Sequence, residues 1–356
     1  MHRFRYRFQF RVRVRIWLRK LFGKKRKKRT KSVSFRALFG AFDSPLPPAL
    51  PYVDPPWPEV AQAGQLRSAL LDPGQLSYRQ FHNRYCSHTY ELNDLSEIFS
   101  SHALEWNILG RDAPWWSVIS VNKWKGKRQI TEAGKREFYD GGDAHVAEVR
   151  KAHPQLQGIV LDFGCGLGRL GMAFARLPNV SHVFCIDQSV HHLSIARDEW
   201  SRRRGQTTAR LHFVHSTPDL LAAMRGRQVD FVHSVIVLQH MVPPLQQVYL
   251  EQLCDVLAPG GSGWIQIPTA VGHSMRSGIM THGHCDLEAS IRLGGAQMHA
   301  TPLRFLKPML AARGCTVLIE DVGGKYLGQP DSDTRWKSAV LHLRKTHASR
   351  SRMPAE

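Results

Sequence analysis

Between two apolar segments of this chain lies a turn that has glycine at three alternate positions, Gly164, Gly166 and Gly168. The apolar run over residues 158–161 predicts a buried strand, and residues 167–177 predict a helix. Glycine lets the backbone bend sharply off the strand, and its lack of a side chain lets a ligand lie against the main chain. The helix then directs unpaired N–H groups and its positive dipole end at that ligand. Residues 158–177 therefore predict a strand–turn–helix unit that binds a nucleotide or nucleoside.

The spacing of these glycines distinguishes between kinds of nucleotide site. A phosphate-binding P-loop needs Gly-x-x-x-x-Gly-Lys-Ser/Thr, and no lysine follows Gly168. A dinucleotide fold needs Gly-x-Gly-x-x-Gly, whereas here the glycines alternate and Asp162 stands just before the first of them. A carboxylate so close to the turn would repel a pyrophosphate but would attract a cationic ligand. The pattern therefore favours a positively charged nucleoside.

The pattern Asp-x-Gly-x-Gly-x-Gly over residues 162–168 resembles the first motif of class I S-adenosylmethionine-dependent methyltransferases, whose cofactor carries a cationic amino group and a sulfonium. The next apolar run, 183–186, ends in Asp187. An acid at the tip of the second strand, about twenty residues past the glycines, can accept hydrogen bonds from both ribose hydroxyls. Gln188 is placed to reach the same sugar or the adenine.

Helices alternate with short strands along the whole resemblance, which covers residues 135–345. Further strands are predicted at 211–214, 229–234, 264–268, 315–319 and 338–343, and helices at 189–204, 249–257 and 302–313. Such alternation predicts an α/β fold with a doubly wound, largely parallel sheet. The resemblance implies a Rossmann-like sheet of seven strands, mostly parallel with the last strand antiparallel, together with a helical N-terminal cap and a disordered basic arm.

The resemblance also implies which residues contact the cofactor, S-adenosyl-L-methionine. They are Asp162, Gly164, Cys165, Gly166, Gly168, Asp187, Gln188, Ser234 and Tyr139. Members of the family often place an acid or amide after the third strand, near the adenine amine. This chain has His215, Ser216, Thr217 and Pro218 there, which leaves Ser216 as a weak candidate for that contact.

His240 is the candidate catalytic base. A sulfonium is already a strong electrophile, so the protein mainly aligns the acceptor with the methyl group. An oxygen or amine acceptor also needs a group that takes its proton, and histidine does so near neutral pH. His240 follows the fourth strand, where the resemblance places the methyl group. The alternative is that His240 only hydrogen-bonds the backbone or shapes the pocket.

Composition divides the chain into five parts. They are a basic arm (1–43), a proline-rich linker (44–59), a helical cap or acceptor-pocket region rich in tryptophan (60–134), the methyltransferase domain (135–346) and a flexible tail (347–356). Residues 1–42 hold 16 of the 49 lysines and arginines and no acid, so the remainder carries only +4 of the formal charge of +20. The body of the chain is therefore nearly neutral, and the basic arm carries most of the net positive charge.

The basic residues between 3 and 36 have several interpretations. An anionic membrane surface, a nucleic acid or a targeting signal would each suit such a segment. We favour a solvated, disordered extension, and a start codon upstream of the one that the native protein uses is a further alternative. No apolar span resembles a signal-peptide core or a transmembrane helix, and we expect a cytoplasmic protein.

Three other patterns are weaker. Asp54-Pro55-Pro56-Trp57 resembles the tetrapeptide of nucleic-acid amino-methyltransferases, but the prolines before it make the required strand improbable. The six cysteines are dispersed without paired spacing, so no disulfide framework is expected. Histidines 282, 284 and 299 and Cys285 lack a second close pair at zinc-finger spacing, so no metal is expected.

These observations support one leading hypothesis and two others. The leading hypothesis is O- or N-methylation of a small-molecule or glycan-like acceptor. The second is a nucleic-acid methyltransferase that grips phosphates with its basic arm, which predicts strongly salt-dependent binding. The third is a non-catalytic protein that binds S-adenosylmethionine without turnover.

Overall fold

The computed structural model describes residues 92–346, except 204, 206, 208, 217–219, 221–223, 225, 242, 271–297, 302 and 328–336. The predictions for the basic arm, the linker with its Asp54-Pro55-Pro56-Trp57 tetrapeptide, the first part of the cap, the segment around His282 to Cys285 and the tail lie outside these residues. Within the part described, no helix is long and apolar enough to cross a bilayer.

A seven-stranded sheet organises the described residues, in the order β3-β2-β1-β4-β5-β7-β6. The strands are β1 (Gly158–Phe163), β2 (Val180–Asp187), β3 (Arg210–His215), β4 (Val229–Ser234), β5 (Leu257–Ala270), β6 (Cys315–Asp321) and β7 (Lys337–Lys345). Strands β1 to β5 pair in parallel, and β7 pairs antiparallel with both β5 and β6. The predicted Rossmann-like sheet with an antiparallel last strand is confirmed.

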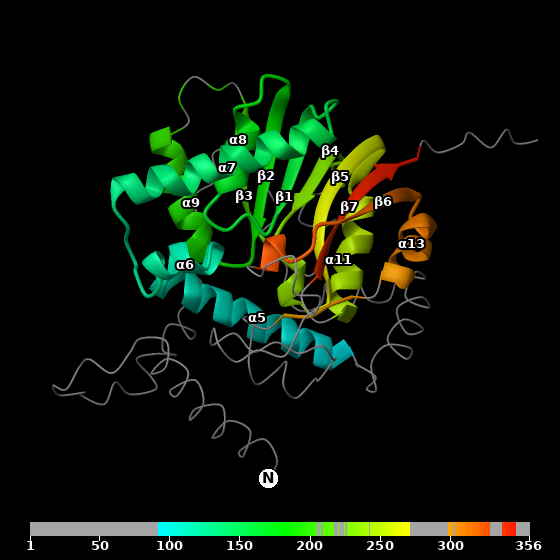
Figure 1. Ribbon diagram of the computed structural model, residues 1–356, viewed down its shortest axis with the longest axis horizontal. Helices are drawn as coiled ribbons and strands as arrows, with labels where there is room; N and C mark the ends of the chain where they lie inside the picture. Colours follow the sequence, from blue (N-terminus) through cyan, green and yellow to red (C-terminus); the bar gives the residue numbers. More distant parts are fainter. Residues whose placement is uncertain are drawn as a thin grey trace, which may run out of the picture. The chain divides into compact units, whose positions relative to one another are not determined.

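Helices cover this sheet and the ends of its strands (Figure 1). Those described are α5 (Leu92–Asp112), α6 (Pro114–Val118), α7 (Glu132–Ala152), α8 (Arg169–Ala175), α9 (Val190–Arg203), α11 (Pro243–Asp255) and α13 (Leu303–Ala312), with short 3₁₀ turns η1 (Asn122–Trp124), η2 (Leu238–His240) and η3 (Lys325–Leu327). Thr131 is the N-cap of α7, and its Oγ1 accepts the Gly134 N–H at 3.1 Å. Helix α7 packs against α8, which lies against β1 and β2.

Helix α11 and strand β5, which meet near the proline–glycine segment at 258–261, have other bounds than the sequence predicts. Apolar spacing predicts a helix over 249–257, whereas α11 already begins at Pro243, since proline is tolerated in a first helical turn. The predicted strand 264–268 is the central part of β5, which runs from Leu257 to Ala270. Residues 258–261 are not a loop between α11 and β5. They belong to β5, which pairs with β4 from Leu257 onward, with a register shift.

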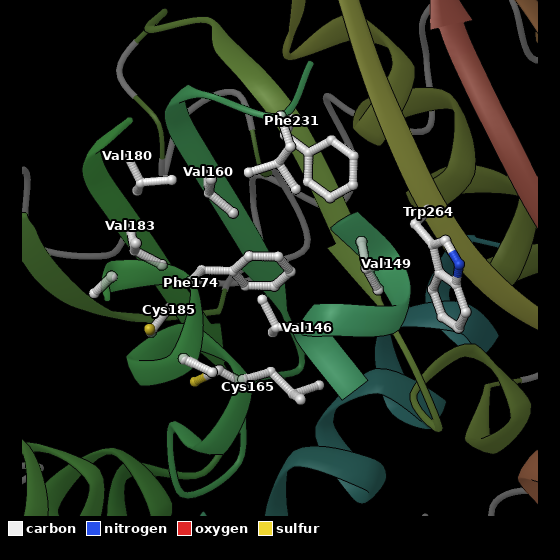
Figure 2. Packing of buried hydrophobic residues seen from close by; sticks show 14 of the residues in the cluster. Val146, Val149, Val160, Cys165, Phe174, Val180, Val183, Cys185, Phe231 and Trp264 are labelled. Atoms are coloured by element: carbon white, nitrogen blue, oxygen red, sulfur yellow. The ribbon is translucent and has the colours of Figure 1, made fainter. Parts of the chain in front are cut away.

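The hydrophobic core between the sheet and helices α7 and α8 holds the ends of β1 and β4 in place. Phe174 of α8 lies at the centre of this cluster, with Val160 of β1, Phe231 of β4 and Val149 of α7 around it (Figure 2). Each of these side chains is at most 1% exposed. Burying a side chain of this size contributes about 1.5–3 kcal/mol. The strand ends that carry the glycine turn and the loop after β4 are therefore held on a rigid base.

Helices α5 and α6 belong to the described part of the predicted cap region, and they lie at the edge where the parallel strands end (Figure 1). Asn107 of α5 accepts the Val190 N–H at 2.9 Å, which caps the start of α9. Gly110 lets α5 lie close to the start of α9, because a Cβ at this position would lie only 2.4 Å from Ser189 Oγ. Helix α5 is thus attached to the junction between β2 and α9.

Candidate cofactor site

The glycine turn after β1 is packed too tightly for side chains. Gly164 and Gly166 have φ of 75° and 54°, in the left-handed region that favours glycine. A Cβ on Gly164 would lie 2.1 Å from Val237 Cγ2, and one on Gly166 would lie 2.7 Å from Val118 Cγ2. The loop after β4 and helix α6 therefore approach the turn from two sides, and glycine at both positions makes this approach possible.

Asp187 at the end of β2 is joined directly to this turn. Its carboxylate accepts the Gly166 N–H at 2.8 Å and the Ser189 N–H at 2.8 Å. Burial alone would raise the pKa of Asp187, but His192 and these two N–H groups lower it below its ordinary value. Asp187 is therefore a buried carboxylate that stays ionised at neutral pH.

A chain of polar contacts leads from Asp187 to the cap. His192 Nδ1 of α9 lies 3.6 Å from Asp187 Oδ1. On the other side of the ring, His192 Nε2 is in hydrogen-bond contact with Ser117 Oγ of α6 at 2.8 Å. The orientation of the carboxylate is thus linked to the position of α6.

One pocket brings most of the predicted residues together. Its walls include six of the ten predicted site residues, which are Gly164, Cys165, Gly166, Asp187, Gln188 and His240. Ser216, the weak candidate after β3, also lines it. The same walls contain residues that the sequence reasoning missed: Trp106, Ser117, Arg169 and His192. Sequence spacing gives no signal for Ser117 and His192, because α6 and α9 meet only in the folded chain.

The other four predicted residues do not line this pocket but lie directly behind it. Gly168 has φ of 73° and forms the N-cap of α8. The Tyr139 hydroxyl donates to the Leu167 carbonyl at 3.2 Å, so this residue supports the turn from α7. Ser234 is fully buried at the end of β4, and its Oγ has no hydrogen-bond partner among the described residues.

Asp162, the fourth of these, ends a buried polar chain beneath the turn. Its Oδ1 contacts His233 Nδ1 at 3.0 Å, and His233 Nε2 contacts His145 Nε2 at 3.0 Å. Burial, and then the neighbouring His233, lower the pKa of His145 to about 2, so this ring is neutral at physiological pH. The second carboxylate oxygen of Asp162 is buried without a partner in the described structure.

The loop after β4 forms the remaining wall and is strained. Ile236 has φ of 61°, a conformation that costs a β-branched residue about 1–3 kcal/mol. Its N–H donates to Gln266 Oε1 of β5 at 2.8 Å, which holds the loop in place. The loop continues into η2, where the His240 ring packs edge-on against Trp106 with the ring centroids 5.0 Å apart. His240 thus lies between the glycine turn and helix α5.

The polar groups of this pocket fit the predicted cofactor. Gly164 and Gly166 contribute only backbone to the turn, and Asp187 offers an ionised acceptor beside it. Gln188 Oε1 and Arg169 Nε are buried without hydrogen-bond partners in the part of the chain that the structure covers. Buried polar atoms are normally satisfied, so these atoms indicate a polar ligand.

Comparisons with known proteins agree with this assignment. Residues 160–261 match the family model described as a methyltransferase domain. No curated protein matches the chain.

Solved structures resemble the chain at low identity. Magnesium protoporphyrin IX methyltransferase from Synechocystis, with bound S-adenosylhomocysteine, is 14% identical over 69% of this chain and 100% of its own, with a TM-score of 0.45. The N-methyltransferase NodS from Bradyrhizobium japonicum is 14% identical over 69% of this chain and 98% of its own, with a TM-score of 0.42.

The matched segment begins in β1 and contains the glycine turn, Asp187, the loop after β4 and the beginning of β5. Residues 160–261 thus belong to a methyltransferase domain, and the seven-stranded sheet with its antiparallel last strand gives this part of the chain a Rossmann-like fold.

Proposed function

We propose that this enzyme methylates an oxygen or nitrogen atom of a small-molecule or glycan-like acceptor, and that His240 takes the proton that the acceptor loses. The observation that carries the proposal is the position of His240. It lines the same pocket as the glycine turn and Asp187, and it is only 9% exposed. S-adenosylmethionine, when bound, supplies an electrophilic methyl group, so the enzyme needs only orientation and a proton acceptor.

The cofactor end of the pocket is proposed to work through Asp187 and Gln188. Asp187 would accept hydrogen bonds from the ribose hydroxyls, and Gln188 would contact the sugar or the adenine. The ionised state of Asp187 supports this role, because charge-assisted hydrogen bonds are about twice as strong as neutral ones. The unpartnered Oε1 of Gln188 supports a ligand contact there.

The surroundings of His240 support proton transfer. His102 of α5 lies near His240, and burial followed by the electrostatic effect of His240 lowers the pKa of His102 to about 3. His102 is therefore neutral at physiological pH, and no charge on it opposes a proton on His240. Trp106 covers the same ring from α5 and limits the access of water.

The position of helices α5 and α6 over the pocket favours an acceptor of limited size. Trp106 of α5 and Val118 of α6 both line the pocket, so the two helices cover the end of the site that faces away from the sheet. A small acceptor, or a single sugar or side group of a larger one, suits such a covered site.

The second candidate is a nucleic-acid acceptor, which the 16 basic residues before Asp43 favour. One labelling experiment separates the two. The full chain is incubated with methyl-labelled S-adenosylmethionine and a fractionated cell extract, beside a chain that lacks residues 1–42. Label in the small-molecule or glycan fraction, with or without the arm, supports the proposal. Label in nucleic acid that disappears with the arm would establish the second candidate, and label in protein would overturn both.

A further inference from the structure

We propose that the acceptor is an uncharged aromatic ring that carries a hydroxyl group, and that the methyl group is transferred to the oxygen of that hydroxyl. This inference rests on the proposed function, which it narrows from small molecules and glycans to phenols. It depends on the walls of the pocket that lie away from the nucleoside.

The order of the strands divides the pocket into two ends. Strand β1 lies between β2 and β4, so Asp187, Gln188 and Ser216, which follow β2 and β3, lie on one side of the glycine turn. The nucleoside is assigned to that side. The walls on the other side come from the end of β1, the loop after β4, η2, α11 and α5. We call this side the acceptor end, and its described lining residues are Trp106, Phe163, Val235, Ile236, Val237, His240, Met241 and Tyr249.

Aromatic rings from four different elements meet at the acceptor end. Phe163 of β1 and Tyr249 of α11 pack with their ring centroids 4.9 Å apart, and both side chains are buried. Trp106 of α5 and His240 of η2 form a second pair, with centroids 5.0 Å apart and an interplanar angle of 66°. Trp106 lines the pocket and is half-buried. A flat ring that contacts such walls gains about 2- to 10-fold in affinity for each aromatic pair, beyond the burial of its surface.

The acceptor end has no lysine, arginine, aspartate or glutamate among the described residues that line it. An ionised acceptor would be buried there without an opposite charge, which is unfavourable. A sugar would bring several hydroxyl groups, whereas the described walls offer three polar side-chain groups, which are the Trp106 indole, the His240 imidazole and the Tyr249 hydroxyl. Polar groups that are buried without partners are costly. A ring with one hydroxyl therefore suits these walls better than a glycan does.

The base at the acceptor end favours a hydroxyl on an aromatic ring. An imidazole accepts a proton near neutral pH, and the pKa of a phenolic hydroxyl is about 10, against about 15.7 for water, which alcohols and sugars resemble. His240 can therefore take a proton from a phenol more readily than from an aliphatic hydroxyl. In the transfer, the phenolic oxygen forms a bond to the methyl carbon while the carbon–sulfur bond breaks. The electron pair of the broken bond remains on sulfur, and the phenolic proton passes to a ring nitrogen of His240.

The first test measures binding without turnover. Three compounds are titrated calorimetrically into the full chain saturated with S-adenosylhomocysteine: 4-methylphenol, 4-methylcyclohexanol, which is similar in size but not aromatic, and 4-hydroxybenzoate, which adds a charge. We expect 4-methylphenol to bind about 10-fold more tightly than either of the others, because it alone combines a flat ring with no charge. Undetectable binding of 4-methylphenol, or equal binding of either of the others, contradicts the proposal.

Variants of Trp106 test the aromatic wall itself. Trp106→Leu should weaken 4-methylphenol binding about 2- to 10-fold, whereas Trp106→Phe should retain most of the affinity. Affinity for S-adenosylhomocysteine should not change in either variant. Trp200→Leu is the control, because Trp200 is a half-buried tryptophan of α9 that does not line the pocket. Unchanged binding of 4-methylphenol in Trp106→Leu, or an equal loss in Trp106→Phe, would show that the aromatic wall does not hold the acceptor.

The second test follows methyl transfer. The full chain receives methyl-labelled S-adenosylmethionine with 4-methylphenol, 4-methylaniline, 4-methylcyclohexanol or methyl glucoside. We expect label in 4-methylphenol, recovered as its methyl ether. Preferential transfer to any of the other three, or to none of the four, contradicts the proposal.

The labelled extract separates this inference from the proposed function. Products of the small-molecule fraction are resolved by chromatography, and their ultraviolet absorption and mass are recorded. Label in compounds with aromatic absorption supports the inference. Label in small molecules or glycans without such absorption would overturn the inference and leave the proposed function intact, whereas label confined to nucleic acid or protein would overturn the proposed function.

Discussion

At the scale of single residues, Asp187 links the glycine turn to the ligand. Its carboxylate already accepts the N–H groups of Gly166 and Ser189, and its ionised state leaves further lone pairs for ribose hydroxyls. We predict that Asp187→Asn weakens S-adenosylhomocysteine binding by about 1.5–3 kcal/mol for each charged hydrogen bond lost. Calorimetric titration measures this change, with the exposed Asp198→Asn of α9 as the control. Equal affinity in the two variants would remove Asp187 from the ribose site.

His240 is the residue on which the proposed proton transfer depends. We predict that His240→Gln lowers kcat about 10²- to 10⁴-fold, because glutamine fills similar space but accepts no proton at neutral pH. Affinity for S-adenosylhomocysteine should stay unchanged, since the cofactor contacts are assigned elsewhere. His191→Gln, an exposed histidine of α9, is the matched control. Full activity in His240→Gln would show that this ring only shapes the pocket.

Sequence reasoning identified the residues whose role depends on local spacing. The alternating glycines and the acid at the end of β2 stand at fixed distances along the chain, and five of these predicted cofactor residues line the pocket. It missed Arg169, His192 and Ser117 because their contacts cross between helices. Only the packing of α6 on α9, and of α7 on α8, brings those side chains to the site.

At the scale of elements, the cap helices α5 and α6 contact the start of α9, at the cofactor end of the sheet. Gly110 lies against Ser189 at the start of α9, and Ser117 reaches His192. We predict that Gly110→Ala pushes α5 away, which destabilises the fold by about 1–3 kcal/mol and weakens S-adenosylhomocysteine binding. Thermal unfolding and titration measure the two effects.

Gly134→Ala in α7 is the matched control for that substitution. A Cβ at Gly134 meets its nearest neighbour at 3.4 Å, an ordinary contact, so the gain in helix propensity remains. This variant should be as stable as the unaltered chain or more stable. If Gly110→Ala behaves in the same way, the close approach of α5 to α9 is not required.

Element boundaries were predicted less well than element types. Apolar runs predicted β1 to β4 within a few residues, because β1, β2 and β4 are buried along most of their length and the edge strand β3 still buries His212 and Val214. Helix α11 and β5 both extend beyond their predicted limits, because Pro243 lies in a first turn and the glycines after Pro259 lie within a strand. In both places the tertiary environment overrides the local propensity of proline and glycine.

At the scale of the whole described fold, a buried acid joins the α7 region to α9. Glu199 is 2% exposed and pairs with Lys135 at 3.0 Å and with Arg202 and Arg203 at 2.8 Å. Burial alone would raise the pKa of Glu199, but the hydrogen bonds from Arg203 and Lys135 lower it below its ordinary value. A depressed carboxyl pKa adds stability above its unfolded value, and this stability is lost as pH falls through the folded value.

We therefore predict that the free energy of unfolding decreases as the pH falls below about 4.5. Glu199→Gln should flatten this acid dependence and lower stability at pH 7, as measured by denaturant unfolding across the pH range. Glu137→Gln removes an exposed acid that pairs with Lys123, and it should leave the profile unchanged. The same acid dependence in Glu199→Gln as in the unaltered chain would exclude this network as its source.

The central claim is that the glycine turn and its two carboxylates select a cationic nucleoside over a phosphorylated one. Parallel calorimetric titrations of the full chain with S-adenosylmethionine and with NAD test this directly. We predict saturable binding of S-adenosylmethionine and no detectable binding of NAD. Binding of NAD, or no binding of S-adenosylmethionine, would contradict the claim.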